Sequence, residues 1–481
     1  MGSNNQRSAI LILLHCLVAK VTTAFVLQST LMAGKFHQGH RDLLKENILN
    51  ASSDVTDQRD ISLLEEWANN NDITVSPAIS LSAESGGNFG ITLQKSSKEL
   101  QTVLSVPKKV VLDSEYIRRE WIDYVTPAME FIERSGLNDS ALNFLLMAKI
   151  LKEYSLGEES RWYSWISSLP ETFDTGVCMN EVEMDCLPPF ALAIANFEDQ
   201  QLEIFRQAFE MVKKTDLFSD CDTVFDDKTT KWAFNVVTTR SWRYQQDDND
   251  NDMIRPIMVP FGDMFNHKEP PNVVVRDADN FDAVEFVLAK DVELDESKGE
   301  ECDLFLSYGL TNPHRFLGVF GFVDETMPEV FCQVLFNNPT PELIRLGCND
   351  RSKMVYRTTD GGISTAVWDC ILHTLLAQVP FEQDEFYTAH IEKDIAKKAE
   401  FHTKYALEES LTLRNHVEGT ANELKELLDK IDALGDYDKD EHPRLELIKR
   451  HNEFLYRVFH DLVLARIDQR AQIEVIKRRG Q

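Results

Sequence analysis

Residues 259–267 read VPFGDMFNH, and residues 305–309 read FLSYG. In the first stretch Asn266 and His267 close an apolar run, where an unpaired buried amide or imidazole would cost about 1 to 3 kcal/mol. In the second stretch a single Tyr308 stands before a glycine, at the end of a short apolar run. The two stretches therefore indicate a packed site in which a few polar groups have specific partners.

Short strand candidates surround these two stretches. Segment 283–288 alternates, so that Val284, Phe286 and Leu288 share one face. The β-branched residues of segment 100–112, together with Pro107, predict a strand that meets an edge or a turn. Further strands are expected at 257–259, 273–275 and 304–307. This part of the chain is therefore predicted to be rich in β structure.

Helical patterns interrupt the β region. Asp113 or Ser114 is the expected cap of a helix that reaches about Glu133, and Asn138 or Asp139 the cap of the next one. Two more helices are predicted at 199–214 and 229–243. The acidic loop at 245–253, QQDDNDNDM, lacks the glycine and the terminal glutamate of a calcium-binding loop, so a solvated connection is expected there.

Beyond about residue 335 the pattern is helical to the end of the sequence. One apolar face contains Ile371, Leu372, Leu375 and Leu376, and a final helix is expected at about 444–477. The long charged stretch at 397–434 offers these candidate core positions: Leu407, Leu411, Leu424, Leu427 and Leu428. A mixed β region followed by helices predicts an α+β protein of two domains, with the boundary near residue 330.

Composition narrows the class of partner. The chain has 481 residues, and 43% of them are hydrophobic, which is typical of a folded protein. Its formal net charge is −30, and such a charge repels nucleic-acid phosphates and favours basic partners. Its eight cysteines are scattered without CxxC pairs or zinc-finger spacing, so neither a disulfide framework nor a metal site is expected.

The first sixty residues look like a targeting leader. Arg7 precedes an apolar stretch at 9–19, and small residues follow at 22–24, which is the layout of a signal peptide over residues 1–24. Residues 25–59 are polar and read as a transit-like segment or a linker. The junction TTA-FVLQ resembles presequences of algae with complex plastids, so plastid import is expected, with ordinary secretion or a buried N-terminal helix as alternatives. No later run reaches about 18 apolar residues, so no stable membrane insertion is expected.

Several catalytic motifs are missing, and one ordered series is present. The chain contains no GxxxxGK[ST], GxSxG or HExxH. It does contain, in order, GGNFG (86–90), WAFNVVTTRS (232–241), VPFGDMFNH, LFLSYG and TNPHRFLGVFGFV (311–323). This series resembles the SET-domain protein methyltransferases, in the subfamily that includes the Rubisco large-subunit lysine methyltransferase and the actin-histidine methyltransferase. The resemblance extends over roughly residues 60–480.

The resemblance implies a domain plan. A SET domain would occupy residues 60–330, with a helical insert at about 113–245. A helical, Rubisco-methyltransferase-like substrate-binding domain would occupy residues 331–481. The fold implied is α+β, with a β-rich SET domain followed by an all-α domain.

The resemblance also implies S-adenosylmethionine as the cofactor that donates the methyl group. Gly87, Asn88 and Phe89 would contact the donor, where Asn88 replaces the usual glycine and tolerates the left-handed backbone region. Arg240 would bind the methionine carboxylate through its fork of donors. The remaining cofactor-binding residues that the resemblance implies are Asp263, Asn266, His267 and Phe322, the last as an aromatic wall beside the adenine.

Tyr308 is the catalytic residue implied by the resemblance. Its phenol oxygen would help to orient the methyl group, while a narrow apolar channel would lower the pKa of the acceptor amine. The usual YGF is FGF here, with Phe320 in place of a tyrosine, so the acceptor remains open. The expected partner is a protein with a target lysine, or alternatively a histidine, in a basic context. A degenerate SET domain that only binds a partner is a further alternative.

Overall fold

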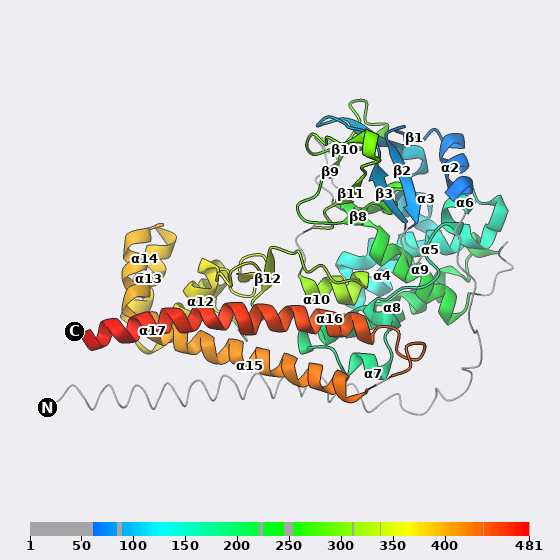
Figure 1. Cartoon of the computed structure of the whole chain (residues 1–481). Coiled ribbons are helices and arrows are strands. Elements are labelled where there is room, and N and C mark those ends of the chain that lie inside the picture. The colour runs from blue at the N-terminus through cyan, green and yellow to red at the C-terminus, as the bar shows by residue number, and fades with distance from the viewer. Residues whose placement is uncertain are drawn as a thin grey trace.

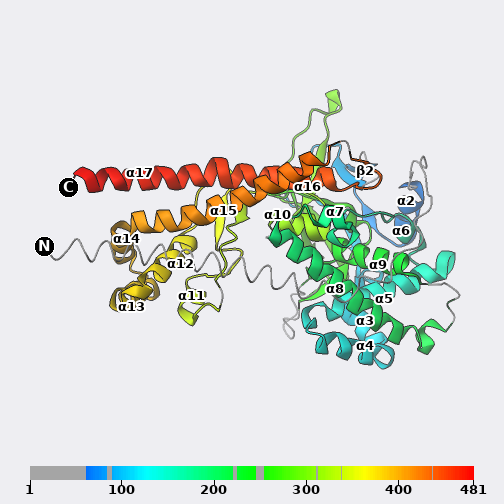
Figure 2. The ribbon, with the colours of Figure 1, turned by 90° about the horizontal axis from the view of Figure 1, so that it is seen from below.

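The computed structural model describes residues 61–83, 89–219, 221, 225–244, 254–309, 312–336, 338–435 and 437–480. The predicted leader (1–24 and 25–59), the residues Gly87 and Asn88, and the acidic loop 245–253 lie outside this part of the chain. Figure 1 shows a lobe of strands and helices beside a long helical lobe that ends at the C-terminus. Seen from below, helices α15 (Ala406–Ala433), α16 (Leu445–Tyr456) and α17 (Ala465–Gly480) extend away from the first lobe (Figure 2).

Three small sheets form the first lobe. One has the order β1 (Thr74–Val75), β4 (Thr102–Pro107), β10 (Ala283–Leu288) and β9 (Val273–Asp277). The second has the order β2 (Ile79–Ala83), β3 (Phe89–Leu93), β11 (Cys302–Leu306) and β8 (Asn266–His267). The third has the order β5 (Leu112–Asp113), β7 (Arg255–Met258) and β6 (Trp242–Tyr244). The strands predicted around residues 102, 257, 273, 283 and 304 are therefore confirmed, with ends that differ by a few residues.

Helices fill the sequence between β5 and β6. They are α3 (Ser114–Glu120), α4 (Ile122–Arg134), α5 (Ala141–Leu156), α6 (Tyr163–Ser167), α7 (Glu181–Met184), α8 (Pro189–Val212) and α9 (Asp227–Arg240). A further helix, α2 (Ile61–Asn70), precedes the sheets. The helical block inside the β region was therefore predicted correctly in kind, and α9 ends at Arg240, three residues before the predicted end at 243.

Three details of the helix prediction were wrong. The helix expected to run from Asp113 to Glu133 is two helices that break at Trp121, although Asp113 does cap the first one through the backbone N–H groups of Glu115 and Tyr116. Asn138 and Asp139 form a 3-10 turn instead of capping α5. Helix α8 begins at Pro189, ten residues before the predicted start at residue 199. A proline at the first helical position is a favourable start.

The second lobe is mostly but not entirely helical. After α10 (Pro313–Arg315) and a π-helical turn (Phe316–Phe320), its helices are α11 (Pro341–Arg345), α12 (Thr365–Leu375), α13 (Pro380–Ile391), α14 (Ile395–Lys404) and α15, and α16 continues through a second π-helical turn into α17. Strands β12 (Glu329–Phe331) and β13 (Val355–Arg357) pair as an antiparallel ribbon. The expectation of an all-α domain was therefore wrong in this detail. β12 and β13 are short segments with β-branched residues, and they come together only in the folded chain.

The buried face of α15 also differs from the prediction. Leu424 and Leu428 are buried as expected, but Leu411 is 48% exposed and Leu407 and Leu427 are half-buried. The stripe that packs against α12, α16 and α17 is made of Leu413, Val417, Ala421, Leu424, Leu428 and Ile431. The smaller residues Val417 and Ala421 also belong to this stripe. The prediction used the leucines alone, so it assigned the wrong face as buried in the first half of the helix.

The buried residues form separate apolar clusters. The largest contains the three sheets and the insert helices and runs from Leu64 to Leu306, and a second lies entirely beyond residue 329. A small third cluster joins the lobes, with Ala195 of α8 and Leu317 on one side and Ile431 and Ile448 on the other. Seven cysteines in the described part of the chain are free thiols. No described helix combines the length and apolar character needed to cross a bilayer.

Candidate active site

The VPFGDMFNH and FLSYG stretches lie side by side. Strand β8 pairs in parallel with the end of β11, so that Asn266 faces Phe305 and His267 faces Leu306. Tyr308 follows β11 by two residues and therefore comes directly beside His267. This pairing packs the end of the VPFGDMFNH segment against the strand that leads to Tyr308. Close packing begins before β8, because a Cβ atom on Gly262 would lie 2.2 Å from the ring of Phe286.

Tyr308 is held at both of its polar ends. Its hydroxyl donates a hydrogen bond of 2.9 Å to the carbonyl oxygen of Phe265. Its backbone N–H donates a hydrogen bond of 3.1 Å to Nδ1 of His267. The side chain is half-buried. Tyr308 is therefore oriented by the segment that precedes β8 and by β8 itself.

Aromatic rings surround Tyr308. The ring centroid of Phe320 lies 5.4 Å away and that of Phe322 lies 6.3 Å away. Phe316 stacks on Phe322 with ring centroids 4.8 Å apart, and this stacking holds the Phe322 ring in place. The turn between Phe320 and Phe322 needs glycine at 321, where φ is +76° and a Cβ atom would lie 2.7 Å from the backbone of Asp174. The π-helical turn and this glycine thus build an apolar wall beside the phenol.

Arg240 and Asp263 form a buried ion pair. The Arg240 Nη1 atom lies 3.1 Å from the Asp263 carboxylate and 2.9 Å from its carbonyl oxygen, and Trp165 Nε1 donates to the same carboxylate at 3.2 Å. No side-chain surface of Asp263 is exposed. Through these contacts Asp263 orients Arg240, and its contact with a cofactor stays a prediction.

Asn266 connects two strands of the second sheet. Its Nδ2 atom donates to the carbonyl oxygen of Phe89 at 3.3 Å, across β3 and β8. Of the glycine-rich segment, only Phe89 and Gly90 belong to the described residues, and Phe89 is buried. The structure therefore brings Phe89, Asn266, His267, Tyr308 and Phe322 together, and it does not place Gly87 or Asn88.

Burial dominates the electrostatics of the site. It lowers the pKa of His267 from its ordinary value, although the carboxylates of Asp324 and Glu269 act in the opposite direction. A neutral imidazole is consistent with the geometry, because Nδ1 accepts the Tyr308 N–H and must carry no proton. Burial likewise raises the pKa of Asp263, against the opposing charge of Arg240. Burial therefore favours the neutral form of both His267 and Asp263.

Three residues of the site were missed by the sequence analysis. Trp165 binds Asp263 from α6, Phe316 supports the aromatic wall, and Asp324 faces His267. Phe316 and Asp324 lie on either side of the FGFV pattern (320–323), so their positions gave a usable signal. Trp165 lies about a hundred residues from its partner, and nothing local marks it.

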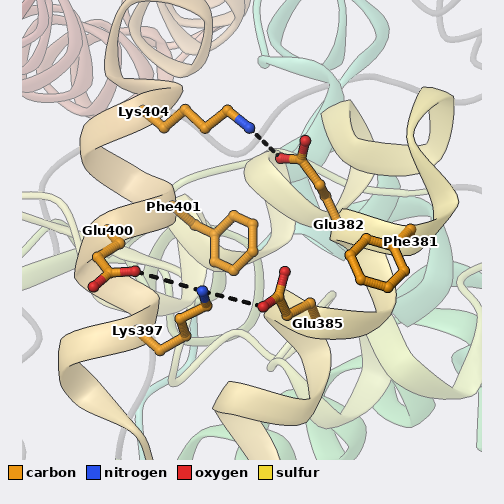
Figure 3. A pocket seen from close by; sticks show the side chains of 7 residues that line it. All are labelled: Phe381, Glu382, Glu385, Lys397, Glu400, Phe401 and Lys404. Carbon is orange, nitrogen blue, oxygen red and sulfur yellow. Dashed lines mark hydrogen bonds and ion pairs between the residues drawn. The ribbon is translucent and has the colours of Figure 1, made fainter.

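A pocket elsewhere in the second lobe offers no comparable chemistry. It has a volume of about 270 Å³ and lies between α13 and α14, where Phe381 and Phe401 line it (Figure 3). Lys397 pairs with Glu385 and Glu400, and Lys404 pairs with Glu382. The charges that line the pocket therefore compensate one another. In Figure 1 α13 and α14 stand at the far end of the molecule from β8 and β11.

Comparisons with known proteins agree with this arrangement. No protein-family model matches the chain. SET domain-containing protein 4 from Homo sapiens is 22% identical over 251 residues, and the protein of the same name from Mus musculus is 24% identical over 259 residues. Each alignment covers 50% of this chain and 54% of the relative, so the chain spans about half the length of the curated relatives it matches.

Solved structures match over more of the chain. Rubisco LSMT bound to sinefungin and monomethyllysine has a TM-score of 0.58 at 13% identity, and Rubisco LSMT bound to AdoMet has a TM-score of 0.53 at 14% identity. The SET domain of LSMT bound to lysine and AdoHcy has a TM-score of 0.55 at 12% identity. Each match covers 86% of this chain and 92% of the solved one. The chain thus has the fold of the Rubisco LSMT structures and is similar over half of its length to SET domain-containing protein 4, in agreement with the resemblance carried by its motifs.

Proposed function

We propose that the protein is an S-adenosylmethionine-dependent protein methyltransferase that modifies a lysine side chain. The observation that carries the proposal is the parallel pairing of β8 with β11, which sets Tyr308 beside Asn266, His267 and the aromatic wall. The similar solved structures contain AdoMet, AdoHcy or lysine compounds, which supports both substrates of the reaction.

The residues present fit this methyl donor. The Arg240 side chain uses Nη1 on Asp263, while its Nε is buried and has no hydrogen-bond partner within the part of the chain that the structure describes. It can therefore still offer a donor to the carboxylate of the methionine part. Asn266 and the main chain at Phe89 would meet the amino-acid end, and Phe322 the adenine. When bound, the donor supplies an electrophilic methyl group on a sulfonium.

Tyr308 and its neighbours suit the acceptor side of the reaction. A lysine has an ordinary pKa near 10.4 and must lose its proton before it can act as a nucleophile. The rings of Phe320 and Phe322 provide an apolar surround that disfavours the ammonium form. The Tyr308 oxygen and the Phe265 carbonyl would supply partial negative charge that stabilises the partial positive charge of a methyl group in transfer. Phe320 has no hydroxyl, so this side of the channel gives the amine no hydrogen-bond partner from that residue.

The substrate proposed is a protein with its target lysine in a basic context. The formal charge of −30 favours such a partner through long-range attraction. A histidine acceptor is the alternative within the same chemistry, and mass spectrometry of the labelled peptide distinguishes the two residues.

Incubation with tritiated S-adenosylmethionine and cell or plastid extract tests the activity. The wild type is expected to label protein, and Tyr308→Phe is expected to reduce the rate. Tyr116→Phe is a suitable control, since Tyr116 is 68% exposed and on the insert. Absence of label with the wild type would contradict the proposal. A calorimetric titration with the donor then separates an inactive enzyme from a pure binding module, because a binding module should show no saturable heat.

We also propose that residues 1–59 direct the protein to a plastid through a signal and a transit segment. Support comes only from the sequence pattern of Arg7, the apolar stretch 9–19 and the TTA-FVLQ junction. A fusion of residues 1–60 to a fluorescent protein, expressed in an alga with complex plastids, tests it. Fluorescence in the secretory pathway would contradict plastid import.

A further inference from the structure

A histidine and an aspartate face each other next to Tyr308 without a direct hydrogen bond. The Nε2 atom of His267 lies 3.7 Å from Oδ2 of Asp324. Both atoms are buried, and neither has a hydrogen-bond partner among the residues that the structure describes. The side chain of His267 is 1% exposed and that of Asp324 is 11% exposed. A buried donor and a buried acceptor at this distance attract each other electrostatically, because little water screens them.

The other side of the His267 ring fixes its proton. Since the backbone N–H of Tyr308 donates to Nδ1, a neutral ring must carry its proton on Nε2, which is the atom that faces Asp324. The ring also packs between Tyr308 and Phe316, with centroid distances of 5.1 and 4.6 Å. The imidazole ring is thus held in one orientation and has a defined tautomer.

Asp324 is itself held in place. Its Oδ1 atom accepts hydrogen bonds from the backbone N–H of Thr326 at 2.8 Å and from the Thr326 hydroxyl at 2.7 Å. These bonds leave Oδ2 as the oxygen that faces His267. The carboxylate therefore cannot rotate freely, and the face that it presents to the imidazole is an acceptor.

We propose that Asp324 is a positioning residue for Tyr308, acting through His267. Its carboxylate selects the Nε2-protonated tautomer of His267, which leaves Nδ1 free to accept the Tyr308 N–H and so fixes the main chain that carries the phenol. The proposal rests on the proposed methyl transfer only for its effect on rate. The same kind of tautomer control by a carboxylate on a histidine is a general device of enzyme sites.

The isosteric variant Asp324→Asn makes a specific test. Thr326 offers two donors, so the asparagine oxygen would keep these bonds and its NH₂ group would face Nε2 of His267. The asparagine N–H and the N–H at Nε2 of His267 would then be two donors that face each other. If the imidazole moved its proton to Nδ1 to avoid this, that proton would face the Tyr308 N–H instead. We expect a fall in kcat of about 10- to 100-fold with little change in KM for S-adenosylmethionine, as for other residues that orient a functional group from behind.

Hydrogen–deuterium exchange gives a readout that needs no activity. The amide of Tyr308 should exchange faster in Asp324→Asn than in the wild type, while exchange in α5 and α15 stays the same. Glu325→Gln is the matched control, because it removes the same charge from the adjacent residue, whose carboxylate faces Arg450 and Arg457 instead. Glu325→Gln should change neither the exchange nor the rate.

A second pair of variants separates positioning from simple packing. His267→Asn retains an oxygen near the place of Nδ1 to accept the Tyr308 N–H, whereas His267→Leu fills space without an acceptor. His267→Asn should keep more methyl-transfer activity and slower Tyr308 exchange than His267→Leu. Unchanged exchange and unchanged kcat in Asp324→Asn would overturn the proposal. Faster exchange in Asp324→Asn, in a protein whose wild type labels no substrate, would support the positioning role and refute the methyltransferase function separately.

Discussion

Replacement of His402 should remove a pH-dependent part of the stability of the helical lobe. The imidazole of His402 on α14 lies between two buried carboxylates: Nε2 is 2.9 Å from Asp369 on α12, and Nδ1 is 2.7 Å from Glu409 on α15. Both ring nitrogens therefore face acceptors, and only the doubly protonated ring satisfies both. The lobe thus contains a charged histidine that links three helices.

The magnitude follows from the pKa of this group. Burial by itself lowers the pKa of His402, but the hydrogen bonds and charges of Asp369 and Glu409 outweigh it and raise the pKa to about 9, from 6.5. Such a shift corresponds to about 3 kcal/mol of stability. Because the folded state binds the proton more tightly, this contribution is complete below pH 6.5 and is lost as the pH rises through about 9. The side chain is 19% exposed, so solvent screening is modest.

Urea unfolding of the wild type and of His402→Gln, between about pH 6 and about pH 10, measures this contribution. Hydrogen–deuterium exchange of peptides from α14 and α15 reports the lobe concerned. The difference in the free energy of unfolding between the two proteins should shrink by about 3 kcal/mol over this range. His460→Gln serves as the control, since the His460 side chain is 50% exposed and such surface pairs contribute little. A difference that stays constant from neutral to alkaline pH would refute the reasoning.

Three further predictions concern the site and the core. Arg240→Lys should weaken binding of S-adenosylmethionine about 10- to 100-fold in a calorimetric titration, because lysine lacks the fork of donors, whereas Arg276→Lys on the surface should not. Gly262→Ala should destabilise the protein by about 1 to 3 kcal/mol in thermal or urea unfolding, since its Cβ would overlap the ring of Phe286; unchanged stability would contradict the packing described. Leu413→Ala should cost about 2 to 5 kcal/mol and Leu411→Ala less than about 0.5 kcal/mol, because the first is buried and the second is 48% exposed; the reverse order would restore the predicted phase of α15.

The sequence by itself determined the local elements and the order of the motifs. Alternation predicted β10 over its full length, 3.6-residue spacing predicted the insert helices in kind, and Asp113 was recognised as a cap. These features depend on residues within one or two turns of each other, so a single sequence contains the information. The motif series from GGNFG to FGFV was sufficient to indicate the fold that the Rubisco LSMT structures share, because an ordered set is more specific than any of its members.

Only the tertiary structure decided which distant groups meet. The parallel pairing of β8 with β11 joins residues about forty positions apart, and the Trp165 bond to Asp263 joins residues 98 positions apart. It also placed Asp263 where it orients Arg240, and Asp324 against His267. Periodicity and local propensity specify which face of an element is buried, but not which other element covers it, because that choice depends on packing across the whole fold.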